Sequence, residues 1–255
     1  MRKSVIVGCQ ILKGCLRSRS LSLIIFFVLA LILFMSMVTS SDSAFREPLV
    51  IDSGLSLINI FSLILVALVI VPIFQNERSV NTLTAALSFN LSRDQYLRGL
   101  WIGASAALSI NYLAMSLILI VNLALLRIPL ELGIFRQLFL NFCELITLGS
   151  FAIAFSVFFS YVVATMMTAS IYVIGHMTTS FHMALQEWQG SATASVLRLV
   201  NLVIPDLSLF NLKDIVIKHS SIPVTYELIA VVYAATMIFI ALEIARYKLN
   251  RESLL

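Results

Sequence analysis

The sequence has 255 residues, of which 60% are hydrophobic and 12% are charged, and its mean hydropathy is +1.01. A soluble globular domain carries roughly 25% charged residues, so this composition excludes one and indicates an integral membrane protein. The formal net charge of +4 comes from basic residues beside apolar runs, a pattern typical of a positive-inside bias and not of nucleic-acid binding. Cys9, Cys15 and Cys143 are too few and too scattered for a disulfide framework.

Residues 1–20 carry basic side chains and no acidic ones. On a helical wheel, apolar residues such as Val5 and Cys9 fall opposite basic residues such as Lys3 and Lys13. This pattern predicts an amphipathic helix in the cytoplasmic interface, with its basic face toward anionic headgroups. The alternative is a solvated basic leader. A secretory signal is not expected, because the apolar run that follows is longer than the roughly 7–15 residues of a signal core.

Three charge-free runs come next along the chain, at 21–38, 55–74 and 100–126. Each is long enough for the roughly 20 residues that a helix needs to cross a hydrocarbon core of about 30 Å. A short polar loop is predicted at 40–54, between the first two spans. Pro72 lies near the end of the second span and lacks an N–H, so a kink is predicted just before it.

A polar island at 75–99 separates the second and third spans. Within it, Val80, Leu83 and Leu87 recur at the spacing of one helix face. A helix with one narrow apolar face and many polar neighbours lies on a surface and does not cross a bilayer. The sequence therefore predicts a surface helix at 77–90.

The end of the island carries the signature of a helix start. Ser92 followed by Gln95 is a capping box, in which each side chain bonds the backbone N–H of the other residue. A new helix is therefore predicted to begin at Arg93 and to continue without Pro into the third span. The island would then be joined rigidly to a membrane helix, so that movement of one is felt by the other.

The stretch 137–186 contains Glu144 as its only charged residue and follows a turn at 127–136. As one helix it would be about 75 Å long, far beyond the thickness of a membrane. Two spans, at 137–158 and 163–184, are therefore predicted. The hairpin between them is expected at Ser160, Tyr161 and Thr165.

Residues 185–222 form the longest polar loop, and the last span is predicted at 223–242. Six spans place both termini and the surface helix on one side of the membrane. Eleven of the seventeen basic residues then lie on that side: Arg2, Lys3, Lys13, Arg17, Arg19, Arg78, Arg93, Arg98, Arg246, Lys248 and Arg251. The positive-inside rule makes that side cytoplasmic and the loop 185–222 extracytoplasmic. The predicted fold class is an all-α integral membrane protein with six transmembrane helices, an N-terminal interfacial helix and a cytoplasmic helix between the second and third spans.

This topology resembles the permease subunits of the type-2 ABC exporters. The motif that follows the second span supports the resemblance. It consists of Glu77, Arg78, Asn81, Thr82, Leu83, Ser92, Arg93, Tyr96 and Gly99. The sequence departs from the family at Asn81 and Leu100, where the family has Gly and Lys. Residues 204–214 and 241–247 look like the matching stretches of the multicopper-enzyme-maturation permease group. Their extracytoplasmic motif contains Pro205, Asp206, Leu207 and Phe210.

The resemblance implies the membrane subunit of an exporter in a bacterial inner membrane, with helix 77–90 as its coupling helix. Such a subunit dimerises with a second copy or a paralogue, and it leaves a place for an extracytoplasmic accessory protein. Separate ATPase subunits would dock on Glu77, Arg78, Thr82, Leu83, Leu87, Ser92, Arg93 and Tyr96. The chain has no G-x-x-x-x-G-K-[ST] loop to hold phosphates, so ATP and Mg²⁺ are expected on the partner chain, with no cofactor and no enzymatic activity on this one.

Polar residues inside the spans are further candidates. Glu144 is expected to contact a substrate or a proton, or else to pair with Arg136 or Arg127 near the headgroups. Asn59 is a second candidate for the substrate path. A packing role, through hydrogen bonds between helices, is favoured for Asn59, Asn111, Asn122 and Asn141.

Metal binding and enzymatic functions have less support in the sequence. A copper site suits imidazole and thioether groups, but simple packing is favoured, and no metal is expected, at His176, Met177, His182 and Met183. Neither G-x-S-x-G nor H-E-x-x-H occurs, so an intramembrane hydrolase has no support. The alternatives to the exporter are a stand-alone secondary transporter or channel, and a membrane anchor of a larger assembly.

Overall fold

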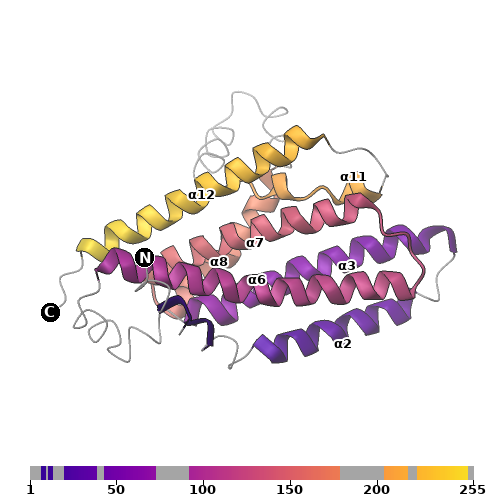
Figure 1. Cartoon of the computed structure of the whole chain (residues 1–255), viewed down its shortest axis with the longest axis horizontal. Coiled ribbons are helices and arrows are strands. Elements are labelled where there is room, and N and C mark those ends of the chain that lie inside the picture. The colour runs from indigo at the N-terminus through magenta and orange to yellow at the C-terminus, as the bar shows by residue number, and fades with distance from the viewer. Residues whose placement is uncertain are drawn as a thin grey trace, which may run out of the picture.

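The computed structural model describes residues 7–9, 11–13, 20–38, 43–72, 92–178, 204–217 and 223–251. In this part of the chain all regular secondary structure is helical, and the longer helices lie side by side along the long axis (Figure 1). The elements are α2 (Ser20–Val38), α3 (Ser43–Leu65), the π-helix η1 (Val66–Ile70), α6 (Arg93–Leu125), α7 (Leu132–Phe158), α8 (Tyr161–His176), the 3₁₀ turn η2 (Ser208–Phe210), α11 (Lys213–Ile217) and α12 (Val224–Arg251).

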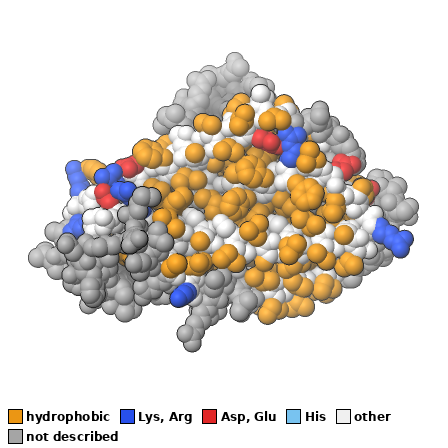
Figure 2. Space-filling model, viewed as in Figure 1, with side chains coloured by type: hydrophobic (Ala, Val, Ile, Leu, Met, Phe, Trp, Pro, Cys, Tyr) orange, Lys and Arg blue, Asp and Glu red, His pale blue; other side chains and the backbone are white. Residues whose placement is uncertain are grey.

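Four helices are long and apolar enough to cross a membrane. They are Glu47–Ile70, Arg93–Leu125, Leu132–Phe158 and Val224–Arg251, and the shorter helices Ser22–Phe34 and Tyr161–His176 are also apolar. Hydrophobic side chains cover the middle of the face in Figure 2, and charged side chains lie toward the two ends. An apolar outer surface of this extent suits lipid and not water. The chain is therefore a helical membrane protein.

The helices define two chemically different ends of the bundle. At one end the start of α6 meets the end of α12, where Arg93 donates to the carbonyl of Leu249, and Lys248 lies over the ring of Phe158. We call this the Arg93 end. At the opposite end, the Arg136 end, Arg136 at the start of α7 forms an ion pair with Glu227 at the start of α12. Both ends of the described chain lie toward the Arg93 end (Figure 1).

Several helices begin or end outside the predicted bounds. The polar loop predicted at 40–54 is wrong, because α3 already begins at Ser43 and continues through Pro48. In the same way α7 begins at Leu132 and not at 137, and α12 continues past 242 to Arg251. The same reason explains all three differences. Polar and charged residues mark where a helix leaves the apolar layer, but its backbone hydrogen bonds continue beyond that point.

The break between the fourth and fifth helices lies where the sequence predicts it. α7 ends at Phe158 and α8 begins at Tyr161, although Thr165, also expected in the hairpin, lies inside α8. The irregularity expected before Pro72 is a π turn over Val66–Ile70, closed by a bond from Val71 N–H to the Val66 carbonyl. A proline cannot donate to the helix, which favours such a local change of hydrogen-bond register.

The N-terminal segment packs on α6 through glycine. Gly8 and Ile11 are buried, whereas Cys9, predicted on the apolar side, is exposed. A Cβ on Gly103 would lie 2.6 Å from the carbonyl oxygen of Gly8, so the two backbones touch. This close approach needs glycine at position 103 and leaves little room for a side chain at position 8, so it determines which face of the described segment is buried.

Residues 204–217 are inserted into the bundle and do not form a solvated loop. α8 stops at His176, only part of the way along α7, and the peptide N–H of Leu207 donates to the carbonyl of Gly175 at 3.0 Å. Beyond that point the segment packs against α7, where Leu207 and Phe210 are fully buried. The predicted polar loop 185–222 is therefore wrong for this part of it, because Leu207, Phe210 and Leu212 give the segment a buried apolar face.

Gln137 holds the irregular backbone of this segment. Its Nε2 donates to the Phe210 carbonyl at 2.9 Å, and its Oε1 accepts the Leu212 N–H at 2.7 Å. The side chain is fully buried. Backbone groups that are neither helical nor hydrated need such partners inside a membrane.

Gln137→Leu should lower the free energy of unfolding by about 2–4 kcal/mol, because two buried backbone groups lose their partners. Thermal unfolding in lipid nanodiscs measures the loss. Asn111→Leu is the matched control, since the Asn111 amide donates to Ala107 in its own helix. Equal losses in the two variants would contradict a special role of Gln137.

Candidate functional site

The start of α6 is fixed by the capping box that the sequence predicts. The Ser92 hydroxyl accepts the Gln95 N–H at 3.3 Å, and the Gln95 side chain accepts the Ser92 N–H at the same distance. Asp94 lies in the first turn, where a negative charge favours the positive end of the helix dipole. From this start α6 continues for 33 residues without interruption.

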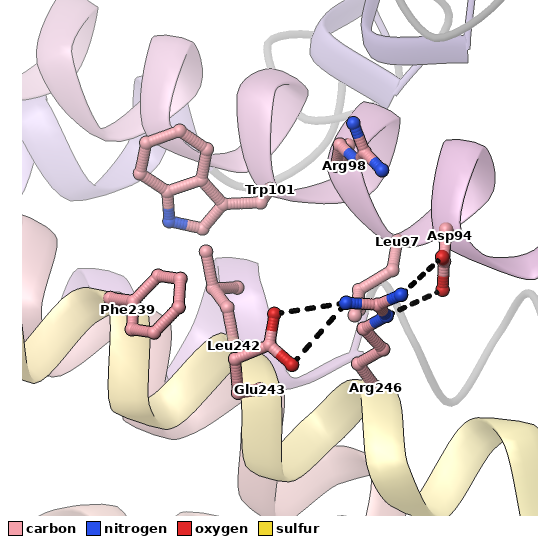
Figure 3. A pocket seen from close by; sticks show the side chains of 8 residues that line it. All are labelled: Asp94, Leu97, Arg98, Trp101, Phe239, Leu242, Glu243 and Arg246. Atoms are coloured by element: carbon pink, nitrogen blue, oxygen red, sulfur yellow. Dashed lines mark hydrogen bonds and ion pairs between the residues drawn. The ribbon is translucent and has the colours of Figure 1, made fainter.

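The first turn of α6 is held to the last turns of α12 by charged side chains (Figure 3). Arg246 grips Asp94 with two contacts, Nε to Oδ1 at 3.0 Å and Nη2 to Oδ2 at 2.9 Å. Arg246 also donates to Glu243 on its own helix at 3.2 Å. A two-pronged contact of this kind fixes the angle between the helices more than it adds stability, because the pair is exposed to water.

Arg93 is a second cation that holds α6 to α12. Arg93 Nη1 donates to the carbonyls of Leu249 at 2.8 Å and Asn250 at 3.3 Å. These carbonyls belong to the last turn of α12, which has no helical N–H to offer them. The α6–α12 joint, defined by Arg93, Asp94 and Arg246, therefore caps one helix end while it aligns another.

A cavity of about 260 Å³ opens beside the joint, between α6 and α12. Trp101, Phe239 and Leu242 form its apolar part, and its residues together are Asp94, Leu97, Arg98, Trp101, Phe239, Leu242, Glu243 and Arg246 (Figure 3). The Trp101 indole N–H donates to Ser150 of α7 at 2.9 Å. The wall of the cavity is thus bonded to a third helix, α7.

The predicted docking residues are only partly placed. Residues 73–91, with Glu77, Arg78, Thr82, Leu83 and Leu87, lie outside the described residues. Of the other three, Ser92 is exposed and caps α6, Arg93 contacts α12, and Tyr96 is 3% exposed and packs inside the bundle. Sequence reasoning missed Asp94 and Arg246. An acidic first turn is the signal that could have indicated Asp94, whereas Arg246 lies before the basic last turn of α12 and has no such signal.

The predicted substrate-path residues are buried. Asn59 on α3 and Glu144 on α7 are 6% and 4% exposed. The pairing of Glu144 with Arg136 is wrong, since Arg136 pairs with Glu227 one helix away. Glu144 instead lies beside His176, with Oε1 at 3.4 Å from Nε2.

Two asparagines of the predicted spans form side-chain hydrogen bonds with a residue of their own helix. Asn111 donates to Ala107 of α6, and Asn141 accepts from Gln137 of α7. The predicted bonds between helices are therefore wrong for these two residues. Each of these bonds joins residues four positions apart on one helix, Asn111 to a backbone carbonyl and Asn141 to a side-chain amide, so neither uses a neighbouring helix.

The motif that the sequence predicts to be extracytoplasmic forms an internal polar cluster at the Arg136 end. Asp206 Oδ1 accepts the Ser208 N–H at 3.0 Å and its hydroxyl at 2.6 Å, and the Asp206 N–H donates to the Tyr233 hydroxyl at 2.7 Å. Pro205, Leu207 and Phe210 are buried around it. The sequence gives no local signal for Tyr233, because its partner is 27 residues away.

The residues considered for a copper site lie at the end of α8 and in the chain that follows it. His176 Nδ1 lies 3.0 Å from the Tyr172 carbonyl, while His182 and Met183 fall outside the described residues. Within the described ranges no group of three or more His, Cys, Asp or Glu side chains is placed to hold a metal ion.

Comparisons with known proteins give no matching family model and no significant match among curated proteins.

Arg246→Gln should loosen the α6–α12 joint, because Asp94 loses both of its contacts with α12. The expected result is faster hydrogen exchange of the backbone amides in the first turns of α6, measured in lipid nanodiscs. Arg251→Gln is the control: it removes a cation from the same helix, where Arg251 lies over Tyr247 and not over α6. Equal exchange in the two variants would show that the joint is not held by Arg246.

Proposed function

We propose that the chain is the membrane-spanning subunit of a type-2 ABC exporter, a non-enzymatic permease that separate ATPase subunits drive. The observation that carries the proposal is α6. Its first turn follows directly on the predicted coupling segment, and the same turn is tied to α12 by Arg93 and Asp94. A push on residues 77–90 would then reach two membrane helices at once.

The distribution of charge supports a cytoplasmic Arg93 end. Among the described residues, cations outnumber acids there, and the reverse holds at the other end. The Arg93 end has Lys13, Arg93, Arg98, Arg246, Lys248 and Arg251 with Asp94 and Glu243, whereas the Arg136 end has Arg127, Arg136 and Lys213 with Glu47, Asp52, Glu131, Asp206 and Glu227. By the positive-inside rule the Arg93 end faces the cytoplasm, and so do both termini, in a bacterial inner membrane.

Six spans fit this orientation. The four long helices would be joined by α2 and α8, which are apolar but shorter, and α8 is extended at the Arg136 end by the inserted segment 204–217. Two such bundles, from a second copy or a paralogue, would form the path for a hydrophobic, amphipathic or lipid-linked substrate. An accessory protein, where one is used, would bind at the Arg136 end.

The proposed mechanism depends on the stiffness of α6. An α-helix transmits displacement along its axis because every turn is hydrogen-bonded to the next, and the Ser92 cap fixes the residue at which α6 begins. ATP and Mg²⁺ would be held by the partner chain, and closure of that partner would move helix 77–90. The α6–α12 joint would convert the movement into a change between the bundles.

Mutations should separate two properties: the binding of the ATPase subunit to helix 77–90, and the transmission of its movement to α12. Glu77→Ala with Arg78→Ala should reduce co-purification of an ATP-hydrolysing chain with the full-length protein, because both charged contacts of the docking helix are lost. Arg93→Ala should leave co-purification intact and lower ATP turnover in the complex, because Arg93 holds α12.

Arg251→Ala serves as a control that changes charge at the same end of the bundle. Isolation of an active transporter that contains no ATP-hydrolysing chain would contradict the proposal and favour a stand-alone transporter. Full turnover in a docked complex whose α6–α12 joint is broken would contradict the mechanism alone.

A further inference from the structure

Glu144 and His176 meet inside the bundle, away from the α6–α12 joint. Glu144 lies in the middle of α7, and His176 is the last residue of α8, so the pair joins the two helices of the hairpin. The Glu144 side chain is 5% exposed and that of His176 is 21% exposed. Buried ionisable groups among apolar helices are costly unless each is satisfied.

The ring of His176 has a defined tautomer. Its Nδ1 lies 3.0 Å from the backbone carbonyl of Tyr172. A carbonyl oxygen can only accept, so the proton of a neutral ring is on Nδ1 and Nε2 is left as a bare acceptor. That Nε2 is the atom that faces Glu144.

The carboxylate brings a second acceptor to the same place. Oε1 of Glu144 lies 3.4 Å from Nε2, and among the described residues neither Nε2 nor the other carboxylate oxygen, Oε2, has a hydrogen-bond partner. Two acceptors that face each other away from water repel, and neither can satisfy the other. A single proton removes this repulsion, because the residue that carries it becomes a hydrogen-bond donor and the other residue accepts that bond.

We propose that Glu144 and His176 form a proton-binding site inside the membrane bundle and hold one proton between them. The site is separate from the proposed docking function, because neither residue belongs to the Arg93 end. Its ligand is a proton taken from the aqueous side and returned to it, and no other co-reactant is needed. Release of the proton leaves two facing acceptors, which pushes the end of α8 away from α7.

Other titratable groups surround the pair. The positive charge of Lys213 on α11 acts on both residues, and the negative charge of Asp206 acts on His176. Lys213 is held by Ser56 of α3 at 2.7 Å. The hydroxyls of Tyr112 on α6 and Tyr172 on α8 are also within electrostatic reach of Glu144. Tyr112 donates its proton to the Leu138 carbonyl and so is not the missing donor.

The direction of the pH effect follows from proton linkage. Near neutral pH the folded pair keeps a proton that the unfolded chain has released, so the folded state binds more protons and rising pH lowers stability. The contribution is complete at acidic pH and is lost as the folded pair titrates.

The test compares thermal unfolding of the full-length protein in lipid nanodiscs between mildly acidic and mildly alkaline pH. Glu144→Gln places a permanent amide donor opposite Nε2, so it should abolish the alkaline loss of stability that the wild-type protein shows. Glu243→Gln, which changes an exposed carboxylate, should keep that loss. The same pH dependence in wild type and Glu144→Gln would overturn the proposal.

A second measurement does not depend on the variant folding. Infrared difference spectra of the wild-type protein at neutral pH should show either a buried carboxylic acid or an imidazolium, and one of these signals should vanish in a single step on alkalinisation. Comparison with His176→Phe assigns the signal, since the chain has two other histidines. An ionised carboxylate beside a neutral imidazole at neutral pH would overturn the proposal.

Discussion

The constraint on which this structure depends is that apolar surroundings offer no water to backbone or side-chain polar groups. Long helices satisfy it along most of the described chain. Where the chain leaves α geometry, at residues 204–212, Gln137, Tyr226 and Tyr233 supply the missing bonds. Several buried polar atoms of the described residues still lack a partner, and the ionisable ones among them belong to Glu144 and His176, which makes this pair informative.

The two ends of the bundle use polar groups in different ways. At the Arg136 end, Arg136 and Glu227 join the starts of α7 and α12, and the inserted segment is buried beside them. At the Arg93 end the contacts are exposed and come from the terminal turns of α6 and α12. An arrangement with one firmly packed end and one joint made of surface charges suits a device that is moved from the charged side.

The local features of the chain could be predicted from its sequence, and the tertiary ones could not. The Ser92 cap and the break at Ser160 were within reach because each depends on a few neighbouring residues or on a length that cannot fit a membrane. Helix ends such as Ser43 were missed because polarity marks the edge of the apolar layer and not the end of a helix. The contact of Arg246 with Asp94 spans 152 positions, and no spacing rule reaches that far.

The proposed function requires that residues 77–90 are a lever on which an ATP-hydrolysing chain acts from the cytoplasm. Its most direct test is photo-crosslinking in native membranes, with a photoreactive amino acid in place of Leu83 of the full-length protein. If residues 77–90 are such a lever, position 83 forms a crosslink to a separate ATP-hydrolysing subunit on the cytoplasmic side, and the crosslink changes when nucleotide binds. A position 83 that only reagents outside the cell can reach, or one without a crosslinked partner in a transport-active membrane, would contradict it.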